Sequence, residues 1–231
     1  MSPRDSMQAA YVLHSRPYLE TSGIVDLFTL EQGKVSVVAK GLRRPTSKLR
    51  GVMQPFVPLH VHWRGKQPLK SLLVAEATGL NGIIQGSALM CGLYINELLQ
   101  RLLVPNEPVP RLYVYYQYVL NALVAGDDVE GALRTFEHKL LSEIGYALPI
   151  DTVLANQLYY FDPPSWSFEA VTSIDEDLRH SAFNGQQLLD IADDCYETPA
   201  QRSAAKRLMR LAIDHLTADR PLQSRRLFKK Q

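Results

Sequence analysis

Histidine and acidic side chains occur at three places where their spacing could support metal or acid–base chemistry. His60 and His62 alternate along one expected strand and so share a face, as two ligands of a metal ion can. No third and fourth ligand can be identified, so two polar residues on a solvated strand face are the favoured interpretation. Asp193-Asp194 and the run 175–177 could hold a divalent ion, but a solvated acidic surface is favoured for both.

Motifs of enzymatic chemistry are not found in the sequence. We see no phosphate-cradling glycine loop, no zinc-protease helix and no nucleophile elbow. Cys91 and Cys195 lie in separate segments and cannot make a zinc knuckle by themselves. We therefore predict that the protein is not an enzyme, has no catalytic residues and needs no metal or other cofactor.

The strongest chemical signal is a basic loop at residues 41–51, which follows an expected strand ending at Lys40. Within this loop, four of the eight residues at positions 43–50 are cations, and they are interleaved with Pro, Thr and Ser. Such a loop is expected not to fold on itself and to offer its charges to a phosphate backbone. Rings that could stack on unpaired bases occur in the same region: Tyr11, Tyr18, Phe28, Phe56 and Trp63. The predicted DNA contacts are Arg16, Lys40, Arg43, Arg44, Lys48 and Arg50, with Arg207 and Arg210 as a secondary patch.

Charge is distributed unevenly along the chain, although the net charge is only +1. Residues 1–80 hold 11 Lys/Arg against 5 Asp/Glu, residues 81–201 hold 5 against 17, and residues 202–231 hold 9 against 2. Basic ends and an acidic middle indicate separate surfaces for separate partners.

Composition is ordinary for a folded protein of one or two domains, with 231 residues, 46% hydrophobic and 21% charged. The apolar stretches 88–104 and 112–125 are short and interrupted by polar residues, which favours core helices over membrane spans. Residues 1–8 do not resemble a secretory signal, and two cysteines fit a reducing compartment. We expect a cytoplasmic, nucleoid-associated protein.

Five short runs with strand character fill the first 80 residues: 9–14, 24–30, 34–40, 56–62 and 69–76. Gly33 closes a tight hairpin, and Val35, Val37 and Ala39 alternate with more polar positions, so one face should be dry. The pattern predicts a small closed barrel of the oligonucleotide-binding (OB) kind, although an SH3-like barrel would give nearly the same string.

Helical periodicity replaces strand periodicity after residue 86. Helices are expected at 87–103 with Ser87 as cap, 109–125, 129–144, 185–193 and from Pro199 to about residue 216, with Thr198 and Gln201 forming a capping box. The segments 158–161 and 167–171 predict a hairpin or a long exposed loop, and the hairpin is adopted in the predicted fold. The predicted fold is α+β, with an OB-fold barrel in residues 1–80 and a mostly helical domain with a small β-hairpin in residues 81–231.

Six segments resemble the RecO family of recombination mediators, in order and along essentially the whole chain. They are VLHSRPYLETS at 12–22, VAKG at 38–41, LRGVMQPF at 49–56, LYINELL at 93–99, FExxLLxxIGY at 136–146 (x is any residue) and PLQSRRLF at 221–228. The resemblance implies an OB-fold followed by a helical domain. It also implies binding to single- and double-stranded DNA, annealing of strands coated by single-stranded-DNA-binding protein, and loading of RecA together with RecR and sometimes RecF. Many relatives carry a four-cysteine zinc motif in the region of residues 151–183, where this chain has no cysteine, so we expect the 159–171 hairpin in its place.

The coating protein typically ends in acidic residues, a hydrophobic pair and a free carboxylate, which requires an apolar pocket with a cation at its rim. We expect this partner site at Arg134, Leu133, Phe136 and Leu140, while an ordinary ion pair of Arg134 with Glu130 or in the neighbourhood of His138 is equally compatible with the sequence. Two other functions stay open at this point: an OB-fold RNA-binding or translation-associated protein, and an enzyme using His60 or the acidic pairs.

Overall fold

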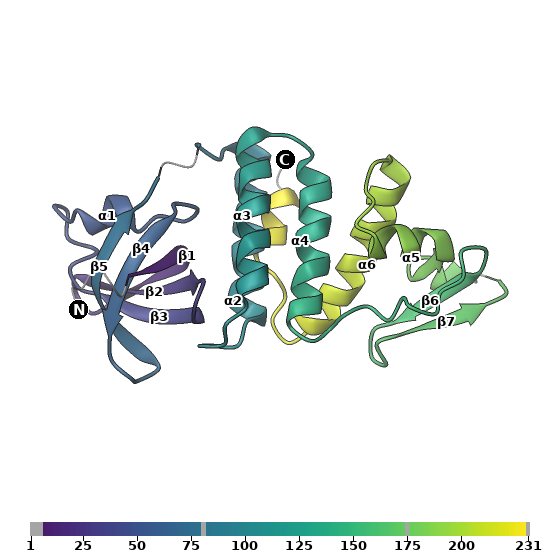
Figure 1. Cartoon of the computed structure of the whole chain (residues 1–231), viewed down its shortest axis with the longest axis horizontal. Coiled ribbons are helices and arrows are strands. Elements are labelled where there is room, and N and C mark those ends of the chain that lie inside the picture. Colours follow the sequence, from purple (N-terminus) through teal and green to yellow (C-terminus); the bar gives the residue numbers. More distant parts are fainter. Residues whose placement is uncertain (1–6, 80–81, 174–175, 230–231) are drawn as a thin grey trace. The chain divides into compact units, whose positions relative to one another are not determined.

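Five strands form a closed barrel in the N-terminal part of the chain (Figure 1). The computed structural model describes residues 7–79, 82–173 and 176–229. The strands are β1 (Gln8–Tyr18), β2 (Ser22–Thr29), β3 (Gly33–Ala39), β4 (Leu59–Arg64) and β5 (Leu69–Ala77), in the order β1-β2-β3-β5-β4. The β3–β5 pair is parallel and the other pairs are antiparallel. All five predicted strands are confirmed, and the closed five-stranded arrangement is OB-like.

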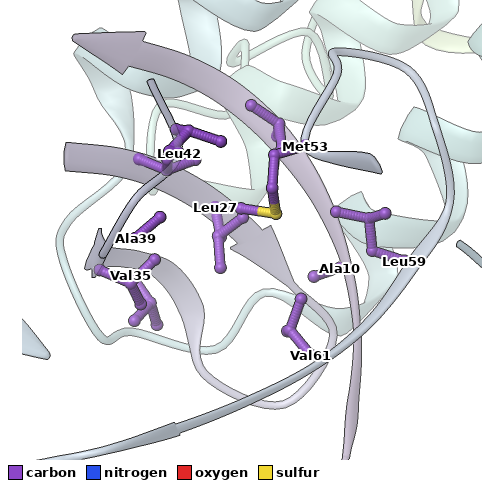
Figure 2. Close-up of a cluster of buried hydrophobic side chains, with 11 residues drawn as sticks. Ala10, Leu27, Val35, Ala39, Leu42, Met53, Leu59 and Val61 are labelled. Carbon is purple, nitrogen blue, oxygen red and sulfur yellow. The ribbon is translucent and has the colours of Figure 1, made fainter. Parts of the chain in front are cut away.

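Alternating side chains of the strands fill the barrel. Figure 2 shows Ala10, Leu27, Val35, Ala39, Leu59 and Val61 together with Leu42 and Met53, which come from outside the strands. On β3, Val35, Val37 and Ala39 are fully buried while Ser36 and Val38 are only half-buried. The predicted alternation is therefore confirmed, and Leu42 and Met53 attach both ends of the basic loop to this core.

The basic loop does fold locally, contrary to the prediction. Backbone N–H groups of Arg44, Ser47 and Arg50 donate to the carbonyl oxygens three residues earlier, so consecutive turns lead into the one-turn helix α1 (Leu49–Val52). Because Leu42 is 7% exposed and Met53 is 4% exposed, burial of these two side chains limits the path that the segment between them can take. The four cations thus stand on an ordered segment.

Two helices pack on the barrel, α2 (Gly86–Leu102) and α3 (Pro110–Ala125). The buried Asn96 amide donates to the carbonyl oxygens of Val12 and Leu13, each at 3.2 Å, where the register of β1 shifts. The Tyr116 hydroxyl donates to the Asn96 side-chain oxygen at 2.7 Å. One polar side chain thus satisfies the backbone at a β-bulge, which would otherwise leave buried acceptors unpaired. The predicted cap Ser87 is wrong: the helix is preceded by Gln85, which makes no side-chain capping bond.

The C-terminal segment returns to α2 as a short 3-10 helix, η3 (Ser224–Lys229). The Glu97 carboxylate accepts the backbone N–H of Gln223 at 2.9 Å and that of Ser224 at 2.8 Å, so it caps this turn. Burial alone would raise the pKa of Glu97, but hydrogen bonds from Ser224, Gln223 and Arg101 outweigh it and hold the pKa below its usual value. The ionised Glu97 thereby fixes the segment that carries Arg225 and Arg226.

The remaining elements form a second compact unit, Asp127–Pro221, whereas the barrel, α2, α3 and η3 belong to the first. Its helices are α4 (Val129–Glu143), α5 (Gly185–Ala192) and α6 (Pro199–Leu216), with the 3-10 turn η2 (Glu176–Leu178). Its sheet has the order β7-β6-β8, from β6 (Leu158–Asp162), β7 (Ser167–Val171) and β8 (Ala182–Asn184). The capping box of Thr198 and Gln201 is confirmed, whereas β8 is not among the predicted elements. Since this division by contacts differs from the one at residue 80, the division into 1–80 and 81–231 stays a prediction.

Among the described residues, no helix combines the length and the apolar character needed to cross a membrane. This agrees with the interpretation of the apolar stretches in α2 and α3 as core helices, because their inward faces are occupied by buried leucines and tyrosines.

Candidate nucleic-acid interface

The β1–β2 hairpin and the basic loop meet at Arg43. Its backbone N–H donates to the Thr21 carbonyl oxygen at 2.9 Å, and its guanidinium lies 3.4 Å from the carbonyl oxygens of Leu19 and Glu20. Beside this contact Leu42 packs so closely over Gly23 that a Cβ at residue 23 would lie 2.8 Å from the leucine. The hairpin tip and the loop are therefore one structured surface at one end of the barrel.

All six cations predicted on the barrel are exposed: Arg16, Lys40, Arg43, Arg44, Lys48 and Arg50. Within the part of the chain that the structure describes, none of them makes an ion pair. Arg16 lies on β1 opposite Ile24 of β2, four of the others lie between the end of β3 and α1, and Arg50 lies within α1. An ordered cluster of unneutralised cations on a barrel is suited to a polyanionic backbone.

The aromatic side chains divide into core rings and surface rings. Tyr11 and Phe28 are buried against Tyr113 and Tyr116, with ring centroids 5.1–5.7 Å apart, and Phe56 is buried as well. Tyr11 and Phe28 pack the barrel against α3, whereas Phe56 packs against Gly92 of α2, so none of the three can stack on a base. Tyr18 is 37% exposed and Trp63 is half-buried. Of the five proposed stacking rings, these two keep a surface for a ligand.

The two predicted cations of α6, Arg207 and Arg210, both contact residues of the second unit. Arg207 donates to the Ala182 carbonyl oxygen at 2.7 Å and its guanidinium lies over the Phe183 ring, 4.4 Å from the centroid. Burial lowers the pKa of Arg207. Arg210 is exposed and lies 3.7 Å from Asp214 one turn later. Arg207 therefore holds β8 against α6, and Arg210 is the accessible member of the predicted secondary patch.

The predicted partner residues lie in the interior of the second unit. Phe136 and Leu140 are fully buried, and Leu133 and Arg134 are each 7% exposed. Arg134 pairs with Glu137 at 3.0 Å, one turn along α4, whereas Glu130 lies 3.8 Å from Lys206. Of the two ordinary pairings expected for Arg134, the one with Glu130 is wrong and the one near His138 is confirmed, because the partner is the buried Glu137, the residue before His138.

The acidic and histidine candidates have structural contacts. Asp194 accepts from His138 at 2.9 Å and pairs with Lys139 at 2.5 Å. Burial would raise the pKa of Asp194, but these two partners lower it on balance. His60 is exposed on β4 opposite Glu76 of β5. Among the described residues no three His, Cys, Asp or Glu side chains group as metal ligands, and Asp175 of the run 175–177 lies outside those residues.

Aromatic packing occupies residues 151–183, the region for which the family resemblance raised the expectation of a zinc motif. Strands β6 and β7 place Phe161 and Phe168 with ring centroids 5.0 Å apart, and Trp166 lies 5.5 Å from Phe161 and 5.0 Å from Tyr146. No cysteine occurs in residues 151–183, and the described residues there bring no set of thiolates or imidazoles together. The residues present do not fit a tetrahedral zinc ion. A small aromatic cluster stabilises the hairpin instead.

Three features of the first unit were not among the predicted site residues. Leu19 at the hairpin tip is 74% exposed, Arg226 on η3 is exposed, and Glu97 fixes η3 through two backbone hydrogen bonds. The net basic charge of residues 202–231 could have pointed to Arg226, but pattern alone does not bring the C-terminus back to α2. Leu19 gave no signal, because a single leucine in a loop is ordinary in sequence.

Comparisons with known proteins agree along the whole chain. Residues 1–81 match the family described as Recombination protein O N terminal, and residues 85–226 match Recombination protein O C terminal. The chain is 42% identical over 227 residues to a DNA repair protein RecO of Methylococcus capsulatus, covering 95% of this chain and 91% of that protein. It is 42% identical over 236 residues to that of Nitrosospira multiformis, covering 98% and 96%, and 41% identical over 226 residues to that of Pseudomonas aeruginosa strain UCBPP-PA14, covering 96% and 94%.

Proposed function

The chain belongs to the RecO family, which gives it a role in recombinational DNA repair, and we propose that it acts there as a mediator without bond chemistry. In this proposal it binds single- and double-stranded DNA and anneals complementary strands that are coated by single-stranded-DNA-binding protein. With RecR, and with RecF where that protein takes part, it helps to load RecA. The place of action is the cytoplasm, at the nucleoid.

The observation that carries the proposal is the cation cluster at one end of the barrel. Six exposed cations without an ion pair among the described residues stand on ordered backbone beside a partly exposed tyrosine, Tyr18. Cations contact the phosphates of any strand, and a ring contacts unstacked bases, so together they favour single strands without selecting a sequence. Because neither group breaks a bond, binding alone is the chemistry of this surface.

Annealing follows from the same electrostatics. Two complementary strands repel each other through their phosphates, and a protein that neutralises phosphates on both reduces this cost while bases pair. The cluster of residues 40–50 supplies one basic surface. Arg226 on η3 belongs to the same compact unit and supplies exposed positive charge from the other end of the chain.

Titration of a fluorescent single strand at several salt concentrations tests DNA binding. The expected result is affinity that falls steeply with salt, with a slope on logarithmic axes of about −4 if six phosphates are contacted at about 0.7 each. A protein that binds RNA strongly and DNA weakly under the same conditions would favour the RNA-binding alternative. Absence of salt-dependent binding to either would refute a nucleic-acid role for the barrel.

The partner site is proposed at α4, where Arg134 has an unused donor. The Arg134 Nε is buried and has no hydrogen-bond partner among the described residues, although another guanidinium nitrogen pairs with Glu137. A terminal carboxylate of the coating protein's acidic tail would use this donor, beside the apolar side chains of Leu133, Phe136 and Leu140. Since these side chains are buried, the tail must displace part of the surface that covers them.

The site is tested with a peptide of the tail sequence in two forms, one with a free C-terminal carboxylate and one with an amidated C-terminus. Removing Arg134 outright takes away a buried ion-pair partner of Glu137, and breaking a buried pair costs about 3–5 kcal/mol of stability, so Arg134→Lys is the better variant. The free-carboxylate peptide should bind the parent about 10-fold tighter than its amidated form, and Arg134→Lys should reduce this difference without changing binding to naked DNA. An unchanged difference would place the tail on another surface.

A further inference from the structure

The tip of the β1–β2 hairpin carries a large apolar side chain in an unfavourable place. Leu19 is 74% exposed and its backbone has a φ of +52°, in the left-handed region that non-glycine residues seldom adopt. The tip is nevertheless defined, because Arg43 bonds to Leu19 and its neighbours Glu20 and Thr21 from the basic loop. A leucine that is held in strained backbone and directed to solvent contributes little to the barrel's own stability.

Tyr18 precedes Leu19 and gives the tip a second apolar surface. It is 37% exposed and pairs with Ser22 across the hairpin. Tyr18 and Arg16 are two positions apart on β1 and so project from the same face of the strand. The tip therefore combines a ring and an aliphatic side chain with cations on both sides, Arg16 on the strand and Arg43 on the loop.

The edge of β1 that faces away from β2 is unsuited to pair with an added β-strand of another protein. Among the described residues β1 pairs with β4 over Gln8–Ala10, and no strand of that part of the chain pairs with the same edge of β1 beyond the bulge. Pro17 lacks the N–H that an added strand would need, and Arg16 places a charge there, two devices that discourage edge-to-edge pairing. A ligand that carries phosphates does not meet this obstacle, because it binds through charge and apolar contacts and does not need backbone hydrogen bonds to the strand.

We propose that Tyr18 and Leu19 contact the bases of the bound single strand, Tyr18 by stacking on an unpaired base and Leu19 by inserting beside it. The cations of the loop hold the phosphates, and the hairpin tip separates neighbouring bases and keeps them unstacked. Such a strand presents free base edges to its complement. This inference rests on the proposed function, and it deepens the ring contact proposed there by adding Leu19 as a second base-contacting side chain at the hairpin tip.

Strands with and without bases separate the two kinds of contact. The probes are a fluorescent oligothymidylate and an abasic deoxyribose-phosphate strand of equal length, bound by the full chain at several salt concentrations. The parent should bind the oligothymidylate about 10-fold tighter, as expected for one stacked base. Leu19→Gly combined with Tyr18→Ala should remove most of this preference, leave affinity for the abasic strand unchanged and keep the salt slope.

The variants are chosen so that the fold is preserved. Glycine accepts a φ of +52° without strain, so Leu19→Gly should not unfold the hairpin. Leu73→Ala is the matched control, because Leu73 is 48% exposed on β5 of the same barrel and should leave the preference intact.

Two results overturn the inference. The first is that the parent binds both strands with equal affinity, and the second is that the double variant keeps the full preference for the strand with bases. Either result would mean that no base contacts the hairpin tip. If the parent shows no salt-dependent binding to either probe, that different outcome would refute the proposed DNA binding itself.

Discussion

Removing the four cations of the basic loop should flatten the salt dependence of single-strand binding in proportion to the phosphates released. The variant carries alanine in place of Arg43, Arg44, Lys48 and Arg50, all exposed and without ion pairs among the described residues. At about 0.7 per phosphate, four lost contacts reduce the logarithmic slope by about 3. Raising salt from about 50 to about 200 mM should then cost the variant about 50-fold less affinity than it costs the parent.

The fold should survive this change, because the loop's anchors are retained. Leu42 and Met53 stay in the barrel core, and Leu49 and Val52 still pack against it. A double variant with only Arg43→Ala and Arg44→Ala should give half the change in slope. As a control, Arg179→Ala with Lys206→Ala removes two exposed charges from the second unit and should leave the slope unchanged. Fluorescence anisotropy with a labelled oligonucleotide measures all four proteins.

An unchanged slope in the quadruple variant, with the thermal transition intact, would refute the reasoning. It would mean that the phosphates lie elsewhere, and Arg210 and Arg226 would then be the next cations to neutralise.

Three further predictions concern stability. Asn96→Ala should lower the free energy of unfolding by about 2–3 kcal/mol in denaturant titrations, since buried carbonyl acceptors and the Tyr116 hydroxyl lose their partner; a loss below about 0.5 kcal/mol would contradict that role. Because the pKa of Glu97 is lowered in the folded state, its contribution is present above the usual value of 4.5 and is lost as pH falls through the folded pKa. Melting temperatures of Glu97→Gln should therefore lie below those of the parent near neutral pH and approach them in acid; a constant gap would contradict this. Prolonged chelation should change neither the melting temperature nor DNA binding, and stoichiometric zinc in tag-free protein would contradict the expected absence of a structural metal.

Periodicity was sufficient to predict the barrel strands and the helices α2 to α6, because each has one buried face. Val35, Val37 and Ala39 repeat every two residues and face the barrel interior, as the pattern predicts. The stripe of α4 repeats at helical spacing and is buried. The residue types at the first positions of α6 also predicted the Thr198 capping box, because its hydrogen bonds join residues within one turn.

Side-chain surroundings were harder to predict, because they depend on residues far apart in sequence. Tyr11 and Phe28 resemble surface rings until α3 brings Tyr113 against them from about a hundred residues away. Arg134 resembles a rim cation, but its burial beside Glu137 is set by how α4 packs against α6. The basic loop lacks any periodic pattern, and its order comes from Leu42 entering the barrel core. Local sequence cannot show such a contact.

Annealing of two complementary strands, each coated by bacterial single-stranded-DNA-binding protein, tests the central proposal most directly. Recovery of duplex is followed by fluorescence energy transfer between labels on the two strands. The parent protein should accelerate annealing well above the coated strands alone, and the quadruple variant of the basic loop should lose most of this acceleration. Equal rates with parent, variant and no protein would contradict the account, as would full acceleration by the variant.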